Sequence, residues 1–215
     1  MSVGGVRRPG GSRLRVLAAL RATSPQPVAL PDVDSWSATR AQKSPEERAD
    51  AFISALEEAD ASVVRVTSEA EIEAVLEAHA PYQRARRVVS GITGIGPRGE
   101  GGAGSELPES FADVDVAVAR GHFGVAENGA VWCDGEGLPH RVTYFLCQHL
   151  VLVVAAATLV DTLHDAYRQL GEQPVLCRER AWSGFIAGPS KTADIEQALV
   201  VGAHGPRSLL VVLVD

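Results

Sequence analysis

The sequence predicts an open α/β fold built on a mostly parallel sheet, and three observations lead to this class. A strand-like segment at 62–66, a helix-like segment at 67–79 and a strand-like segment at 85–90 follow one another, which is the order of a βαβ unit. Later runs at 149–155 and 207–215 are almost wholly apolar, as strands covered on both faces are. A chain of 215 residues with 46% hydrophobic residues is long enough to bury such a sheet in a sizeable core.

The first part of the chain has a different character from the rest. Residues 12–22 have the apolar spacing of a helix, and residues 23–36 are rich in proline, which favours an extended connector. We therefore expect residues 1–43 to form an N-terminal helix and Pro-rich connector, and residues 44–215 to form a single α/β domain.

The domain opens with a clear helix start. Ser44 can cap the helix, Pro45 suits its first position, and Glu46 and Glu47 fall in the first turn, near the positive end of the helix dipole. This helix is expected to run to about Ala59, directly before the strand at 62–66.

Glycines crowd the segment that follows the strand at 85–90. Gly91, Gly94 and Gly96 lie close enough to that strand for backbone N–H groups to approach an anion, although no complete phosphate-loop motif is present. Farther on, residues 97–110 are expected to form a mobile loop.

The remaining elements can be assigned from apolar periodicity. Both parallel and antiparallel pairing of the strands is expected. Strands are predicted at 113–119, 129–133, 141–146, 149–155 and 207–215, and a helix is predicted at 159–170.

Composition excludes several classes of function. The net charge of −7 argues against a nucleic-acid partner, since such proteins neutralise phosphates with an excess of Lys and Arg. No window is long and apolar enough for a membrane span, and the basic N-terminus lacks the apolar region of an export signal, so a cytoplasmic location is expected. Cys133, Cys147 and Cys177 are too widely separated to predict a metal site, so no metal ligands are assigned.

The segment HFGVAENGAV, residues 122–131, places one carboxylate in an apolar, strand-like run. Asn128-Gly129 favours a tight hairpin turn, so Glu127 could be a solvated turn residue. It could also face a pocket as a general base or nucleophile, with Asn128 and Gly129 supplying backbone groups to substrate. From these residues alone Glu127 is a candidate catalytic residue, and both interpretations stay open.

A second candidate site follows Ala187. Gly188 and Pro189 break the chain, Ser190 or Thr192 can cap a helix expected at about 192–201, and Asp194 falls in its first turn. Lys191 would then stand at the positive helix end, where a bound phosphate or carboxylate would compensate its charge. The binding residues predicted here are Gly188, Ser190, Lys191, Thr192 and Asp194.

A glycine-proline turn at 202–207 carries the last two candidates, His204 and Arg207. Each has a structural alternative, because His204 could cap the preceding helix and Arg207 could pair with a surface acid. As binding residues, they would add an imidazole and a guanidinium to an anion site.

Three of these segments together resemble one known family. FGVAENGAV, AGPSKTADIE and GAHGPRSLLVVLV, in this order, are similar to motifs of the lactate-utilization protein C family, which carries the LUD domain. The resemblance implies an open, mostly parallel Rossmann-like sheet flanked by helices with an antiparallel β appendage, as in sugar-phosphate isomerases and CoA transferases. It also implies a role in oxidising L-lactate to pyruvate, with iron–sulfur clusters on partner proteins and no cofactor of the chain's own.

One departure from the family pattern opens an alternative. Asn128 stands where the family usually has Thr, and the resulting AENG is similar to the S-E-N-G signature of CoA transferases, whose Glu forms an acyl-CoA thioester. In the lactate interpretation Glu127 would take the hydroxyl proton of lactate, while Lys191, Arg207 or Arg141 would hold its carboxylate. More generally, the expected ligand is a small molecule that carries a carboxylate or a phosphate. The alternatives are a stand-alone CoA transferase or sugar-phosphate isomerase, and a non-catalytic assembly or ligand-sensing subunit.

Overall fold

Five parallel strands form the central sheet of the chain. In this computed structural model their order across the sheet is β1, β10, β6, β3, β2, and every neighbouring pair is parallel. The predicted fold class, an open α/β sheet flanked by helices with antiparallel strands beside it, is confirmed. The strands are β1 (Ser62–Val66), β2 (Val88–Ser90), β3 (Val116–Arg120), β6 (His149–Ala155) and β10 (Ser208–Val214).

The structure describes residues 11–23, 43–95, 107–135, 138–176, 182–192 and 200–215. The chain divides into two units, Met1–Arg40 and Ala41–Asp215. In the first unit, α1 (Gly11–Ala22) exposes its large apolar side chains, for example Leu14 and Leu20. The second unit contains both predicted site regions and the whole central sheet.

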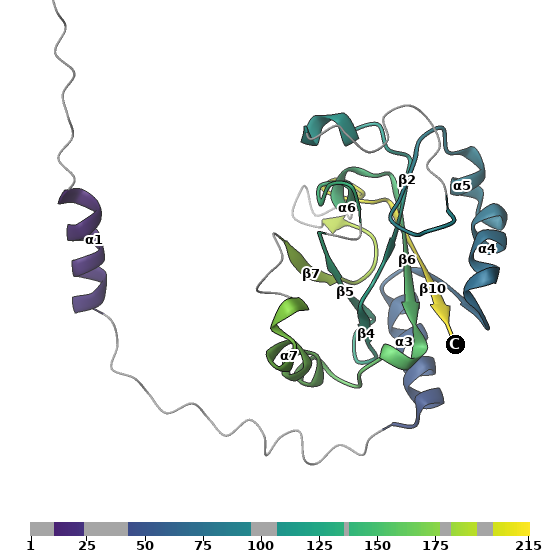
Figure 1. The fold of residues 1–215 in the computed structure, drawn as a ribbon, viewed down its shortest axis with the longest axis horizontal. Coiled ribbons are helices and arrows are strands. Elements are labelled where there is room, and N and C mark those ends of the chain that lie inside the picture. Colours follow the sequence, from purple (N-terminus) through teal and green to yellow (C-terminus); the bar gives the residue numbers. More distant parts are fainter. Residues whose placement is uncertain (1–10, 24–42, 96–106, 136–137, 177–181, 193–199) are drawn as a thin grey trace, which may run out of the picture. The chain divides into compact units, whose positions relative to one another are not determined.

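Helices cover both faces of the sheet (Figure 1). On one face α3 (Pro45–Glu58) buries Phe52 and Leu56 completely. On the other face lie α4 (Ile72–Ala78) and α5 (Ala80–Arg84). Successive residues of β10 alternate between the two cores, because side chains of a strand point to opposite faces.

The start of α3 forms as its sequence predicts. The Ser44 side chain accepts a hydrogen bond from the Glu47 N–H, and the Glu47 carboxylate accepts one from the Ser44 N–H. Pro45 occupies the first helical turn, where its missing N–H costs no hydrogen bond. This reciprocal capping box fixes where the helix begins.

Three antiparallel strands lie on the α3 side of the central sheet. They are β4 (Phe123–Val125), β5 (Ala130–Asp134) and β7 (Ser183–Ile186), in the order β4, β5, β7. Their outer face packs against α7 (Leu163–Glu172), which buries Ala166 and Leu170 there. Figure 1 shows α7 beside these strands, away from the α4 and α5 side.

The remaining elements are short. They are η1 (Glu69–Glu71), η2 (Pro108–Phe111), α6 (Thr143–Leu146), η3 (Ala156–Thr158), η4 (Pro174–Leu176), β8 (Lys191–Thr192) and β9 (Val200–Val201). Among the described residues, no helix is both long and apolar enough to cross a bilayer.

One predicted strand, at 141–146, is wrong. Residues Thr143–Leu146 form the helix α6, in which Thr143 and Tyr144 are buried while Phe145 is exposed. A short apolar run fits both a strand and a helical turn, so periodicity alone did not decide between them. Of the loop predicted at 97–110, residues 97–106 lie outside the described residues, and Pro108–Phe111 forms η2.

Candidate functional site

Glu127 lies in the tight turn between β4 and β5. The Gly129 N–H donates to the Val125 carbonyl at 2.9 Å, and the Asn128 side-chain oxygen accepts from the Ala130 N–H at 3.1 Å. Gly129 has a φ of 68°, as expected for Gly in a turn of this kind. A hairpin therefore forms where the sequence predicts one, but residues 126–129 make a four-residue connection in which Gly129 has a positive φ and Asn128 does not.

The Glu127 carboxylate is exposed and faces the start of α7. Its Oε2 atom accepts a hydrogen bond of 2.9 Å from the backbone N–H of Leu163, the first residue of that helix. Thr162 caps the same helix by accepting from the Asp165 N–H. A carboxylate at a helix N-terminus satisfies a free N–H and is favoured by the helix dipole. This contact gives Glu127 a structural role in addition to the catalytic one predicted from sequence.

The variant Glu127→Gln separates these two roles. The amide oxygen can still accept from Leu163, so we expect the free energy of unfolding to fall by only about 0.3–1 kcal/mol, the usual size of a charge–dipole interaction. Urea titration measures this change. If Glu127 is also the general base, the same variant loses lactate-dependent reduction of an electron acceptor, and full turnover would end the catalytic assignment.

The two C-terminal motif segments meet in space. The Ser190 N–H donates to the Pro206 carbonyl at 2.9 Å, and the Gly202 N–H donates to the Ser190 carbonyl at 2.8 Å. Around this junction β8 pairs with β9, with Thr192 opposite Val200. The helix predicted at about 192–201 is therefore wrong at both of its described ends; Asp194 lies outside the described residues.

Lys191 has a protein partner where an anionic ligand was predicted. Its Nζ forms an ion pair with Asp60, a residue in the left-handed region between α3 and β1. Because Lys191 lies on a strand and not at a helix start, no helix dipole favours an anion at this position. Gly188 lies close to the same end of α3, since a Cβ there would approach the Ala59 carbonyl oxygen to 2.7 Å.

Arg207 lies where β6 and β10 begin. Its N–H donates to the Gln148 carbonyl at 2.8 Å, and its side-chain stem lies over Gly202. A cleft of about 460 Å³ opens there, between α5 and the amino ends of the strands. Its polar lining comes from Arg84, Asp115, Gln148, His149 and Arg207, of which sequence reasoning identified Arg207 alone. His204 is exposed in the same turn as Arg207.

His149 is the histidine that lines this cleft. Its Nδ1 contacts the Ser208 hydroxyl at 2.8 Å. Burial lowers the pKa of His149 below its ordinary value, and the nearby Arg207 lowers it further, while Asp115 acts in the opposite direction. The imidazole is therefore mainly neutral at pH 7.

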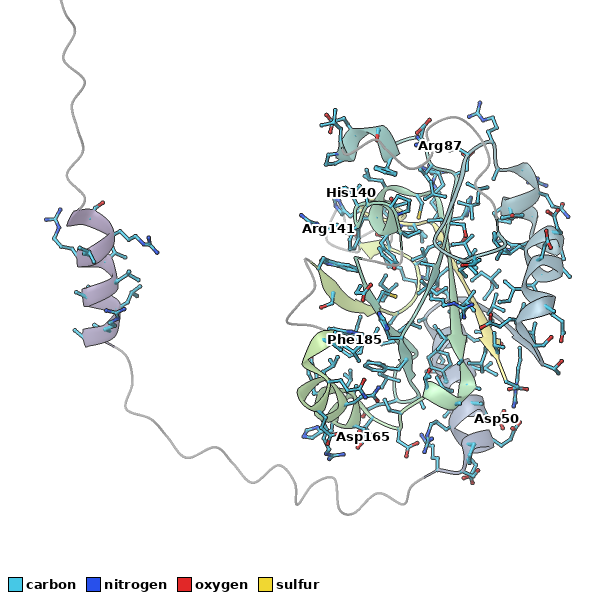
Figure 2. The ribbon with its side chains drawn as sticks, viewed as in Figure 1. Asp50, Arg87, His140, Arg141, Asp165 and Phe185 are labelled. Carbon is cyan, nitrogen blue, oxygen red and sulfur yellow. The ribbon has the colours of Figure 1, made fainter. Side chains whose placement is uncertain are left out.

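The candidate residues fall at opposite ends of the sheet. β6 begins at His149, beside Arg207, and its carboxyl end leads through η3 toward Leu163, the partner of Glu127. Seven residues of strand span about 20 Å, so Glu127 and Arg207 do not share a pocket. Figure 2 shows the same division: Arg87, His140 and Arg141 lie at one end of the domain, and Asp165, in the first turn of α7, lies at the other.

The glycines after β2 belong to the carboxyl end. The Gly91 N–H donates to the Val118 carbonyl of β3, which continues the ladder by one residue. Gly94 has a φ of 90° and open space around it, and Gly96 lies outside the described residues. Gly91 and Gly94 are thus at the opposite end of the sheet from the Arg207 cleft.

A histidine–carboxylate pair is a further arrangement that sequence reasoning missed. His122 Nε2 lies 2.7 Å from the Asp134 carboxylate, which is 3% exposed. The observed register pairs Phe123 with Trp132, so His122 and Asp134 lie beyond the residues that pair β4 with β5, and the Asn128-Gly129 signal does not identify the pair. Buried Tyr144 lies nearby: its pKa is raised by burial and by the charges of Cys133 and Asp134.

The cysteines of the described chain are buried thiols. Burial raises the pKa of Cys133 well above its ordinary range and that of Cys147 to about 12. Both thiols are thereby disfavoured as thiolates, the form that binds metals and attacks substrates. Within the described residues, no group of three or more His, Cys, Asp or Glu side chains is placed to hold a metal ion.

Comparison with known proteins places the chain in a family. The model of the LUD domain matches residues 83–214, more than half of the chain. Lactate utilization protein C of Shouchella clausii is 32% identical over 101 residues, which are 47% of this chain and 44% of that protein. The namesake from Halalkalibacterium halodurans is 32% identical over 120 residues, 52% of this chain and 50% of that protein. The chain thus aligns with about half the length of these curated relatives.

A solved structure supports the fold. The crystal structure of a DUF162 family protein from Deinococcus radiodurans superposes with a TM-score of 0.59 at 17% identity, over 80% of this chain and 99% of that one. The matched LUD region runs from α5 to β10 and includes the Glu127 turn and both C-terminal motif segments. The chain therefore belongs to the LUD domain family.

Proposed function

We propose that this chain is a component of a lactate-utilization system that oxidises L-lactate to pyruvate together with iron–sulfur partner proteins. Membership of the LUD domain family supports the proposal, as do relatives named lactate utilization protein C. The part of the chain that resembles them contains all three motif segments on which the prediction from sequence depended.

The observation that carries this proposal is the position of Arg207. This motif residue lines a cleft of about 460 Å³, a size typical of small-molecule sites, together with a second guanidinium from Arg84. Guanidinium groups bind carboxylates through paired, charge-assisted hydrogen bonds. The cleft is therefore suited to the carboxylate that L-lactate and pyruvate share.

The proposal includes partner proteins because the oxidation of L-lactate to pyruvate releases two electrons and two protons. An iron–sulfur cluster is held by four ligands, mostly thiolates, and the buried, protonated thiols of Cys133 and Cys147 do not fit that donor set. We therefore assign the electron carriers to partner proteins and substrate binding to this chain.

Omitting this chain from a reconstituted system tests the proposal. The iron–sulfur partners and this chain are mixed with L-lactate and an artificial electron acceptor, and acceptor reduction is followed by absorbance. We expect reduction to require this chain and to fall to the level without lactate when it is left out.

Two outcomes would contradict the proposal. Full acceptor reduction by the partners alone would show that the chain is dispensable for the oxidation. Transfer of CoA between acyl groups by the isolated chain, lost in Glu127→Gln, would identify a stand-alone transferase.

A further inference from the structure

Two arginines line the cleft at the amino ends of the strands. Over the described part of the chain, neither Arg84 nor Arg207 forms an ion pair, although both line the same cleft. The Arg207 side chain is not loose, because its backbone is bonded to Gln148 and its stem lies over Gly202. Two guanidinium groups that line one cleft, and have no ion-pair partner among the described residues, are suited to binding an anion.

The cleft also contains groups suited to a hydroxyl. Asp115 lines the cleft, and its Oδ2 atom accepts from the N–H groups of Arg86 and Arg87, at 2.8 and 3.0 Å. His149 is held at Nδ1 by Ser208, which leaves Nε2 as the second polar atom of the ring. His79, directly before the wall residue Ala80, has a buried Nε2 atom without a hydrogen-bond partner among the described residues.

The charge of the cleft selects the class of anion. Arg84 and Arg207 contribute two positive charges, and Asp115 contributes one negative charge. His149 adds none at pH 7, because burial and Arg207 keep its pKa low. The net charge of +1 is cancelled by one carboxylate, whereas a doubly charged phosphate would leave excess negative charge beside Asp115.

We propose that this cleft binds a small monocarboxylate with an adjacent hydroxyl, that is, an α-hydroxy acid. Its carboxylate is held by Arg84 and Arg207, and its hydroxyl hydrogen-bonds to Asp115 or His149. The inference deepens the proposed function and rests on it for the choice of L-lactate as first probe. It places the substrate at the amino ends of the strands, away from the carboxyl ends at which open α/β sheets generally bind ligands. Glu127 is then too far away to act as the general base, so this inference predicts that Glu127→Gln keeps lactate-dependent turnover.

Calorimetric titration of the full chain tests the cleft directly. The probes are L-lactate, propionate, which lacks the hydroxyl, and inorganic phosphate. The variants are Arg84→Gln and Arg207→Gln, with Arg86→Gln as the matched control, because Arg86 is exposed two residues from Arg84 and is outside the cleft lining.

We expect L-lactate to bind more tightly than propionate and phosphate. Loss of one charged hydrogen-bonding partner should weaken L-lactate binding about tenfold to a hundredfold in each cleft variant. The control should bind like the wild type, and thermal unfolding should confirm that all variants are folded.

Three results would overturn the inference. Equal L-lactate binding by both cleft variants and the wild type would place the site elsewhere and leave the proposed function intact. Phosphate binding more tightly than L-lactate, and lost in the same variants, would reject the hydroxy-acid class. Absence of binding by a folded wild-type chain would reject the cleft, while the reconstitution assay would still decide the proposed function independently.

Discussion

Gly129→Ala is expected to lower the free energy of unfolding by about 2–4 kcal/mol, through left-handed strain and overpacking together. Gly129 has a φ of 68°, which an L side chain adopts only with strain. A Cβ at this position would also lie 2.9 Å from both the backbone nitrogen and the Cγ of Leu56. Since Leu56 is fully buried in α3, neither atom can move away easily. Urea unfolding of the variant measures the loss.

Two other glycines provide controls for the two expected causes of this loss, left-handed backbone strain and overpacking. Gly94 has a φ of 90°, but a Cβ there would have nothing within 4 Å, so Gly94→Ala should show the backbone strain alone, about 1–2 kcal/mol. Gly171 lies in α7 with open space, so Gly171→Ala should stabilise the helix by about 0.5–1 kcal/mol. A Gly129→Ala variant no less stable than Gly94→Ala would contradict the close packing of the turn against α3.

The same comparison explains why two motif segments carry glycine. Gly129 lies against Ala55 and Leu56, and Gly188 lies against Ala59, four residues farther along the same helix edge. Both have positive φ. Packing against α3 therefore explains why both positions are glycine, without a bound ligand. If these motifs bind a ligand, their polar residues are the ones available to do so.

The parallel sheet could be predicted because its signals are local. The alternating residues of β1 and the apolar runs of β6 and β10 each carry their own pattern, and the capping residues of α3 mark its start. The Asn128-Gly129 turn likewise follows from local turn chemistry. These predictions needed no information about which strand lies beside which.

The errors arise where tertiary contacts decide. Lys191 and Thr192 carry residues that could open a helix, yet they pair with Val201 and Val200 in β8 and β9. Backbone hydrogen bonds between Ser190, Gly202 and Pro206 hold this loop together, and such pairing between distant residues leaves no mark in helical periodicity. Without a helix start at Lys191, the dipole that would have favoured an anion there is absent as well.

The cleft could not be assembled from sequence for a related reason. Arg84, Asp115, His149 and Arg207 lie at the ends of elements that are far apart along the chain. They meet only because β3, β6 and β10 are neighbouring parallel strands, so that all three begin at the same end of the sheet. A sequence pattern can show at which residue a strand begins. The order of the strands in the sheet decides which of these first residues lie together in a cleft.

Phe52→Ala is expected to have the largest effect on stability, about 3–5 kcal/mol, because it deletes a fully buried aromatic ring and leaves a cavity. The ring lies over Gly124 of β4, where a Cβ would approach its Cε2 atom to 2.7 Å. Phe52 lies in α3, outside the residues 83–214 that match the LUD domain. The variant therefore tests whether this upstream helix is part of the same cooperative unit.

Phe145→Ala is the matched control, since it removes the same atoms from a ring that is 43% exposed and contacts Trp182 edge-on. Its expected cost is about 1 kcal/mol, the contribution of an aromatic pair at the surface. Equal losses for the two variants would mean that α3 contributes no more than a surface contact. The expected difference would instead show that the hydrophobic core of this LUD protein begins before the family match, because Phe52 and Leu56 of α3 belong to the same core cluster as residues of β6 and β10. A fragment restricted to 83–214 would then lack α3, α4, most of α5 and the edge strand β1, so binding and activity are to be measured on the full chain.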